Sequence, residues 1–467
     1  MSDIHNAYLI YTLILLSMKI FRFLLLLVTL CCILSLKPAS IALNLAITAD
    51  KQTYNIWETV KAFRSLTKAS SAFSEPTNKI FSTSYYSTES CVIINVSNYS
   101  GATDGERIQN ALDDVPEEGA IVFIPGGIWK ACNLTGQSKT ILMGTNETIV
   151  RRPVNTTSPF ITFEKRICFA VANIIFDGQN ISEGTGILIM SCTQFEIVNN
   201  TFRDISRNAI RIIGTCEDFK IEKNEFIRCN IAPVILFGSP SERYIQNFTI
   251  VNNFLTKGTD NGKIGVAFAA NGTIVNNTIT NCEYGIATRC VSHIVIINNH
   301  IENCISYAIY LGTQPGDPGS DNIEIIYNYA ANCNIGISRY YGSQPIHNVT
   351  LKNNNILNNE QWDIYANFPA IFIKNTITSA EKLKILNTDV EFIGNIDVEG
   401  QPILLGDINN DLKIDIRDVA VVARLFGSSF SSDNWDPSGD IIGDGVIDMK
   451  DIAIVAKNFG KLWNSQV

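Results

Sequence analysis

The chain has 467 residues, a formal net charge of −9 and a sequence pI near 5.1. This length permits more than one domain. The acidic balance provides no basic face for DNA or RNA, so no nucleic-acid partner is expected.

The first 42 residues have the composition of an export signal. Two basic residues precede an apolar run over 23–36, and small residues follow it. This order predicts a secretory signal peptide over 1–42 and an extracellular protein, secreted or cell-surface associated. An earlier apolar stretch over 8–17 leaves open a retained signal anchor, which would make the membrane a partner. Residues 43–90 are rich in Ser and Thr and predict a linker.

A short helix is expected at the start of the folded region. Thr103 or Asp104 can cap a helix that continues to Val115 with apolar residues on one face. If strands follow it, such a helix would cover their open edge and prevent pairing with another chain.

A short phrase recurs along the middle of the chain, as in 195–202, 248–255 and 294–301. Apolar residues alternate around a marker Asn, and successive markers are 21 to 29 residues apart. Period two predicts short strands with one buried face, whereas a helical solenoid would need a period of 3.6. Asn tolerates a left-handed bend, and stacked amides can bond in a ladder. The markers are Asn200, Asn224, Asn253, Asn277, Asn299, Asn328, Asn354 and Asn375.

Turns of this length with short strands predict an all-β fold, a parallel β-helix solenoid over 91–398 in which each turn pairs only with its neighbours. The repeat resembles the pectate-lyase-like superfamily of right-handed single-stranded parallel β-helices. The resemblance is specific for the fold and only weakly specific for chemistry.

A second strand in each turn is expected to form the binding face, because the longest insertions follow it. In this strand an Ile or Val recurs from turn to turn. The residue after it should point outward, and so should the residue two further on. The first predicted column is Arg211, Ile235, Ala267, Ala287, Tyr310, Ser338 and Tyr365. The second is Ile213, Phe237, Ala269, Arg289, Gly312 and Tyr340.

Aromatic and basic residues of these columns suit a polysaccharide or other glycan, because sugar rings stack on aromatic faces. The weak catalytic candidates are Arg211, Arg289, Tyr310 and Tyr340. Elimination from a uronate needs a base and a cation, which Tyr and Arg could supply. Hydrolysis needs two carboxylates, which the columns lack, although the neighbouring loops could supply them. Whether the chain is an enzyme stays open; an enzyme would be a polysaccharide lyase or an O-glycosyl hydrolase, and the alternative is that these residues only solubilise the sheet.

Four of the 12 cysteines occupy equivalent places in successive turns: Cys229, Cys282, Cys304 and Cys333. Export favours disulfides, but a stacked column of small buried thiols explains the spacing better. We predict that this column is reduced.

Two acidic twelve-residue loops near the C-terminus, 407–418 and 440–451, are each followed by an apolar segment that ends in Phe-Gly. Their oxygen donors stand at the positions that bind calcium in EF-hand loops. The second loop has Ile442 at a ligand position, so we expect the first loop to bind calcium more tightly. The first loop has Leu412 where glycine is usual, and strain at this residue leaves the reverse order open. The predicted ligands are Asp407, Asn409, Asp411, Lys413 (carbonyl), Asp415 and Asp418, and Asp440, Asp444, Val446 (carbonyl), Asp448 and Asp451.

The duplicated loop and helix resemble a type I dockerin and predict a small α-helical calcium-binding domain over 401–463. The resemblance implies a cohesin-type scaffold or surface protein as partner. It also implies that partner-binding residues follow position 9 of each loop. These are Ile416, Arg417 and Arg424 in the first copy and Met449, Lys450 and Lys457 in the second.

Together these patterns predict an exported carbohydrate-active β-helix protein tethered through a calcium-dependent dockerin–cohesin interaction, with a role in polysaccharide catabolism. The alternatives are a non-catalytic glycan-binding adhesin and a structural surface protein.

Overall fold

The structure is a computed structural model that describes residues 92–462, apart from 182, 240–244, 258–261, 340–343, 388 and 410. The predicted signal peptide and linker, and the candidate Tyr340, lie outside the described residues. Within the described part of the chain, no helix is long and apolar enough to cross a membrane.

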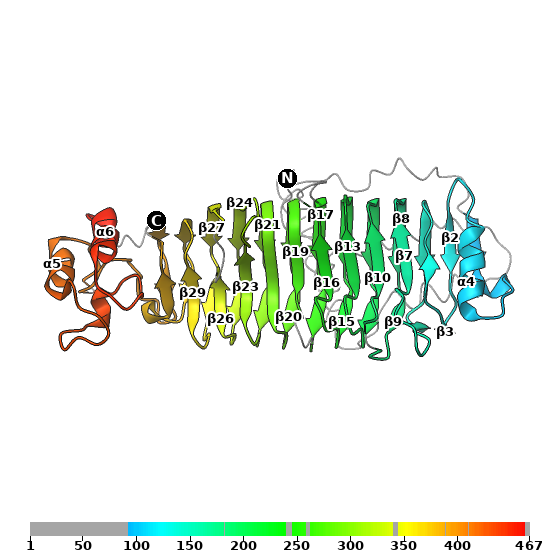
Figure 1. Ribbon diagram of the computed structural model, residues 1–467, viewed down its shortest axis with the longest axis horizontal. Coiled ribbons are helices and arrows are strands. Elements are labelled where there is room, and N and C mark those ends of the chain that lie inside the picture. The colour runs from blue at the N-terminus through cyan, green and yellow to red at the C-terminus, as the bar shows by residue number, and fades with distance from the viewer. Residues whose placement is uncertain are drawn as a thin grey trace, which may run out of the picture. The chain divides into compact units, whose positions relative to one another are not determined.

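The strands are all paired in parallel and form three stacks, in which each strand bonds to the equivalent strand one turn away (Figure 1). Stack 1 contains β4 (Leu134–Thr135), β7 (Ile161–Glu164), β10 (Ile187–Met190), β13 (Ile210–Ile213), β16 (Val234–Phe237), β19 (Ile264–Val275), β21 (Tyr284–Ile297), β23 (Tyr307–Gly312), β26 (Ile335–Ser338), β29 (Trp362–Ala366) and β32 (Leu383–Ile385). The all-β parallel solenoid predicted from the repeat is therefore confirmed.

Stack 2 follows stack 1 in each turn, and β19 and β21 continue through the bend, which joins both stacks into one 22-stranded sheet. Its other members are β1 (Val92–Asn95), β2 (Ala120–Phe123), β5 (Thr140–Met143), β8 (Ile167–Ala172), β11 (Thr193–Val198), β14 (Glu217–Glu222), β17 (Ile245–Val251), β24 (Ser320–Ile326), β27 (Ile346–Lys352), β30 (Ala370–Ile373) and β33 (Val390–Ile393).

Stack 3 is a separate sheet of 12 short strands. It contains β3 (Gly127–Lys130), β6 (Thr148–Arg151), β9 (Ile175–Asp177), β12 (Thr201–Arg203), β15 (Glu225–Ile227), β18 (Phe254–Thr256), β20 (Thr278–Thr280), β22 (His300–Glu302), β25 (Tyr329–Ala331), β28 (Asn355–Leu357), β31 (Thr376–Ile377) and β34 (Ile396–Asp397). The inward residues of the three stacks form one continuous apolar core.

The alternation in the sequence becomes a column of identical side chains inside the core. Phe195 of β11 stacks on Phe219 of β14 with ring centroids 4.6 Å apart, and Phe219 stacks on Phe248 of β17 at 5.7 Å. In-register parallel strands place equivalent residues above one another, so each turn adds the same contact.

The marker asparagines form a buried ladder between stacks 2 and 3. Asn299 donates from Nδ2 to Oδ1 of Asn328 at 3.0 Å and to the Ile274 carbonyl at 2.9 Å, and its backbone N–H also donates to Asn328. The ladder runs without interruption from Asn200 and reaches one turn further than predicted, to Asn395. Each buried amide therefore has its hydrogen bonds satisfied.

The left-handed conformation belongs to the residue before the marker, which corrects the sequence-based expectation. Asn298 has φ 52° and Asn353 has φ 53°, and Lys223 and Tyr327 take the same conformation in other turns. The bend thus uses one residue for backbone geometry and the next for the amide ladder.

The predicted helix at the start of the solenoid is present as α4 (Asp104–Asp113), next to β3 and β4. Thr103 is the N-cap, and its hydroxyl accepts a hydrogen bond from the Glu106 N–H at 3.1 Å. Ile108, Ala111 and Leu112 are buried, so the helix covers the end of the core. A 3-10 turn precedes it at η1 (Val96–Asn98), and a second one, η2 (Ala380–Lys382), precedes β32.

None of the nine cysteines in the described ranges forms a disulfide. Cys229, Cys282, Cys304 and Cys333 are buried at the turns that follow stack 3. The Cys304 N–H lies 3.3 Å from Sγ of Cys333. Burial raises the pKa of the Cys229 thiol to about 12, so it stays protonated at neutral pH.

The C-terminal region contains α5 (Ile416–Leu425), η3 (Pro437–Gly439) and α6 (Met449–Asn458). Its own core is built from Ile414, Val422, Leu425, Ile447 and Val455, in which the two copies contribute equivalent residues. The predicted α-helical character is confirmed, and the boundary near residue 400 stays a prediction.

Candidate functional site

The outward face of stack 1 carries two columns of side chains, and the strand register corrects one predicted member of each. Ile235 pairs with Gly265 and then Ala287, whereas Phe237 pairs with Ala267 and then Arg289. Ala267 therefore belongs to the second column. Gly265 takes its place in the first column. The outward positions of β19 lie two residues earlier than the sequence pattern indicated, so Ala267 replaces Ala269 in the second column.

Arg289 is held by a loop carboxylate. Its Nε and Nη2 donate to the two carboxylate oxygens of Asp317 at 2.9 and 2.8 Å, and its guanidinium lies over the Phe268 ring at 5.2 Å. The hydrogen bond from Arg289 lowers the pKa of Asp317 to about 2. Asp317 is only 8% exposed and also accepts the Gln314 N–H, so this pair ties the loop after β23 to the sheet.

Arg211 differs from Arg289 in its surroundings. It lies on β13, half-buried, and no hydrogen bond or ion pair joins it to another residue in the described part of the chain. Tyr310 stands in the same column four strands further on, which places it about 19 Å away at the usual strand spacing. The two candidates therefore cannot act on one bond, but they can contact one extended ligand.

Aromatic side chains gather on the later turns of this face. Tyr310 lies 5.1 Å from Tyr307, which stacks on Tyr284 at 5.7 Å. Trp362 and Tyr365 lie on β29, two strands beyond β23. The ammonium of Lys384 on β32 lies 5.4 Å from both of their rings. Sequence analysis missed Tyr284, Tyr307 and Trp362, because they precede the alternating segment of their strands. The signal that could have found them is their equivalence in successive turns.

Carboxylates are scarce on this face. Within the two columns as the structure describes them, the one acidic residue is the exposed Glu164 on β7, in register with Met190 and distant from Tyr310. A glycoside hydrolase needs two carboxyl groups on opposite sides of one bond. The described columns therefore do not contain an acid–base pair.

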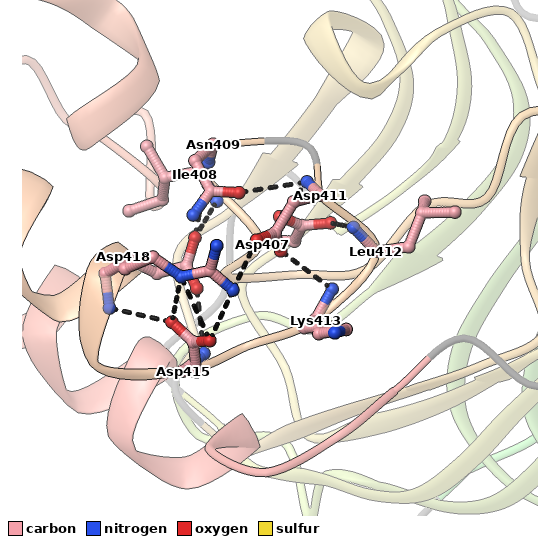
Figure 2. A network of polar contacts seen from close by, with 9 residues as sticks. Asp407, Ile408, Asn409, Asp411, Leu412, Lys413, Asp415 and Asp418 are labelled. Carbon is pink, nitrogen blue, oxygen red and sulfur yellow. Dashed lines mark hydrogen bonds and ion pairs between the residues drawn. The ribbon is translucent and has the colours of Figure 1, made fainter.

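The first acidic loop is closed by hydrogen bonds from its own backbone (Figure 2). Asp407 accepts the N–H groups of Asp411 and Leu412 at 3.1 and 2.8 Å. Asp418, fully buried, accepts three N–H groups, from Ile408, Asn409 and Asp415. Burial raises the pKa of Asp407. The loop's own backbone thus holds its first and last carboxylates on the inside.

Leu412 occupies the sixth position in the left-handed conformation, with φ 66°, and its side chain points away from the carboxylates (Figure 2). The equivalent Gly445 of the second loop has φ 87°. Both loops therefore make the same turn, and the first makes it with a residue that disfavours it.

The second loop repeats this geometry. Asp440 accepts the N–H groups of Gly443, Asp444 and Gly445, and Asp451 accepts those of Ile442 and Asp448. Asp451 is 1% exposed, and burial raises its pKa. Ile442 is 2% exposed, and its hydrocarbon side chain packs among buried apolar residues. It has no oxygen atom and therefore cannot bind a metal ion.

In each loop, a basic side chain forms ion pairs with the carboxylates at positions 5 and 9. Nη2 of Arg417 lies 2.6 Å from Asp411 and 2.7 Å from Asp415, and its hydrogen bonds lower the pKa of Asp415. Nζ of Lys450 lies 2.7 Å from Asp444, whose hydrogen bond raises the pKa of Lys450.

The donor set fits calcium. The first loop offers five oxygen-bearing side chains at EF-hand positions and the second four, and hard oxygen ligands select Ca²⁺. No three acidic, His or Cys side chains form a ready-made metal cluster within the described ranges.

The predicted partner-binding residues lie on the two helices. Ile416 and Met449 are the first residues of α5 and α6 and are 67% and 64% exposed. Arg424 and Lys457 stand in the last turns of these helices. The two copies thus present the same order of side chains.

Comparison with known proteins supports both parts of the architecture. Residues 246–379 match the family model described as a right-handed β-helix region, and residues 405–460 match the dockerin type I domain. No curated protein sequence matches the chain significantly.

Several solved structures are similar to this chain at low sequence identity. A surface adhesin of Streptococcus pneumoniae has a TM-score of 0.52 and 14% identity, with 66% of this chain and 90% of that chain covered. An exopolygalacturonase from Thermotoga maritima has a TM-score of 0.49 and 13% identity over 65% and 92% of the two chains. An α-1,3-glucanase from Streptomyces thermodiastaticus has a TM-score of 0.45 and 15% identity over 66% and 69%. At these identities the likeness concerns the fold alone.

Proposed function

The chain joins a right-handed parallel β-helix to a C-terminal dockerin type I domain, and from this premise we propose that it is a tethered glycan-binding protein. The stack 1 face would bind a polysaccharide, and the dockerin would attach the protein to a cohesin-type partner in the presence of calcium. We further propose an extracellular location, where such an assembly would meet its polysaccharide.

The observation that carries the glycan assignment is the row of aromatic side chains on stack 1. Tyr307, Tyr310, Trp362 and Tyr365 come from β23 and β29, on either side of β26, and Tyr310 and Tyr365 are two strand spacings or about 10 Å apart. Rings spaced along the β-helix axis can stack on successive sugar units of one chain, while Arg211 and Lys384 supply donors for hydroxyl or carboxylate groups.

Binding without catalysis is the activity that the geometry supports best. Arg289 is occupied by Asp317, Arg211 and Tyr310 are far apart, and the described columns contain no carboxylate pair. The adhesin of Streptococcus pneumoniae offers a precedent for this fold in a surface protein. A lyase or hydrolase role in polysaccharide catabolism remains the second candidate, since dockerins commonly accompany such enzymes.

Incubation of the full chain with a panel of acidic and neutral polysaccharides tests this function. We expect retention on at least one immobilised polysaccharide, without release of reducing ends or unsaturated uronates. Release of either product would establish the enzyme instead. Retention that survives the simultaneous replacement of Tyr310 and Tyr365 by Ala would show that the binding surface lies elsewhere.

A further inference from the structure

The position 11 residue of each calcium loop is basic, and its side chain returns to the ligand carboxylates at positions 5 and 9. Arg417 contacts Asp411 and Asp415 at 2.6 and 2.7 Å. Lys450 contacts Asp444 at 2.7 Å and Asp448 at 3.7 Å. Two copies with different basic residues make the same contacts, so the contact belongs to the repeat.

The basic side chain and a calcium ion would use the same carboxylates. Carboxylate oxygens only accept, so a lone pair directed at a guanidinium or ammonium group is not available to the ion. In both loops the other predicted side-chain ligands at the two ends accept backbone N–H groups. The side chain at position 11 would therefore compete with calcium at positions 5 and 9.

The same basic residue follows the exposed apolar residue that begins each helix, Ile416 or Met449. While Arg417 is bound to its own loop, its charged end is turned from the helix surface toward the loop. If the loop released this side chain, the basic member of the apolar–basic pair would become available for docking.

We propose that Arg417 and Lys450 are internal counter-cations of the calcium loops, and that calcium releases them for docking. This inference rests on the proposed calcium-dependent tethering and adds a mechanism to it. Breaking these ion pairs should cost little free energy, because the Arg417 and Lys450 side chains are 58% and 55% exposed and exposed ion pairs are weak.

Calcium titration of the full chain tests the competition. Arg417→Gln should raise the calcium affinity of the first loop about three- to fivefold, since no internal cation is displaced. Lys450→Gln should do the same for the second loop. Arg424→Gln is the matched control, because Arg424 lies seven residues along the same helix, about 10 Å from Arg417. Equal gains in the control, or no gain in the other variants, would overturn the proposal.

Amine labelling followed by mass spectrometry tests the release itself. We expect an acylating reagent to modify Lys450 several times faster with calcium than with chelator, while exposed Lys352 on β27 reacts at one rate in both. If the wild-type chain binds calcium but Lys450 labelling does not change, the release mechanism fails and the tethering proposal stands. If the wild-type chain binds no calcium at all, both fail.

Discussion

At the scale of single residues, neighbours decide what a side chain on the β-helix surface does. Arg211 and Arg289 are the same residue type on the same face, yet Arg289 is bonded to a nearly buried carboxylate and Arg211 is not. A buried carboxylate that loses its partner is costly, whereas a half-buried surface arginine without a hydrogen-bond or ion-pair partner in the described part of the chain can be removed with little effect on folding.

Replacement of the two arginines by Ala should therefore separate stability from binding. Arg289→Ala should lower the free energy of unfolding by about 1–3 kcal/mol, because it leaves Asp317 without its charged partner. Arg211→Ala should leave the melting curve unchanged and weaken retention on the polysaccharide. Thermal melts and retention assays on both variants measure this. Equal destabilisation by both would mean that Arg211 is structural.

The Arg289–Asp317 pair also predicts a pH dependence. The folded-state pKa of Asp317 is about 2, below the ordinary value of 3.8, so the pair stabilises the fold above that ordinary value. This contribution is lost as the pH falls from about 4 to 2. The melting temperatures of the wild type and Arg289→Ala should differ by a constant amount at neutral pH and converge in this acidic window. A constant difference down to pH 2 would contradict the assignment.

Leu412 provides a third test at this scale. A non-glycine residue in the left-handed region costs about 1 kcal/mol, so Leu412→Gly should raise the free energy of unfolding of the dockerin by about that amount. The reverse change in the other loop, Gly445→Leu, should lower it by a similar amount. Denaturant unfolding of both variants at one calcium concentration decides it, and an unchanged Leu412→Gly variant would mean that the backbone there is not strained.

At the scale of the elements, the solenoid is held by features that repeat once per turn. The asparagine ladder satisfies buried amides between stacks 2 and 3, and the phenylalanine columns fill the core beneath stack 2. Because each turn contacts only its neighbours, a defect in one turn should lower the stability of that turn and of the two adjacent turns without changing the architecture.

Asn299→Ala should destabilise the β-helix by at least about 2 kcal/mol, because the Asn277 amide and the Ile274 carbonyl lose their partner. Asn298→Gly is the matched control in the adjacent position. Asn298 is exposed with φ 52°, a conformation that glycine adopts without steric strain, and the change removes only one exposed hydrogen bond, to Asn276, so its effect should stay below about 1 kcal/mol. Denaturant unfolding compares the two, and equal losses would show that the ladder amide is not special.

At the scale of the whole molecule, the chain combines a solenoid that has an extensive apolar core with a small dockerin domain that carries two predicted calcium loops. The dockerin core has few buried residues, and its loops place several carboxylates near one another. A domain of this size commonly needs a metal for stability.

Calcium should therefore raise the melting temperature of the dockerin and leave that of the β-helix nearly unchanged. An ion that binds only the folded form stabilises it by about 2.7 kcal/mol at 100 times its dissociation constant. Calorimetry of the full chain with calcium and with chelator should show one shifted and one fixed transition. Asp418→Ala should remove the tighter site and Asp451→Ala the weaker one. A shift of both transitions would mean that the two parts unfold together.

The sequence by itself determined the repeat, the all-β solenoid, the capping helix and the two acidic loops, each followed by a helix. These follow from local periodicity and spacing, because a strand's buried face and a loop's ligand positions are set by nearby residues. The tertiary structure decided the rest. The strand register placed Gly265 in one column and Ala267 in the other. The left-handed bend and the laddered amide belong to two adjacent residues of each turn. Arg289 is hydrogen-bonded to the carboxylate of Asp317, which lies in a loop. The same is true of Arg417, whose charge is turned onto its own loop. Such outcomes depend on contacts between residues far apart in the chain or on side-chain direction, and one-dimensional spacing contains neither.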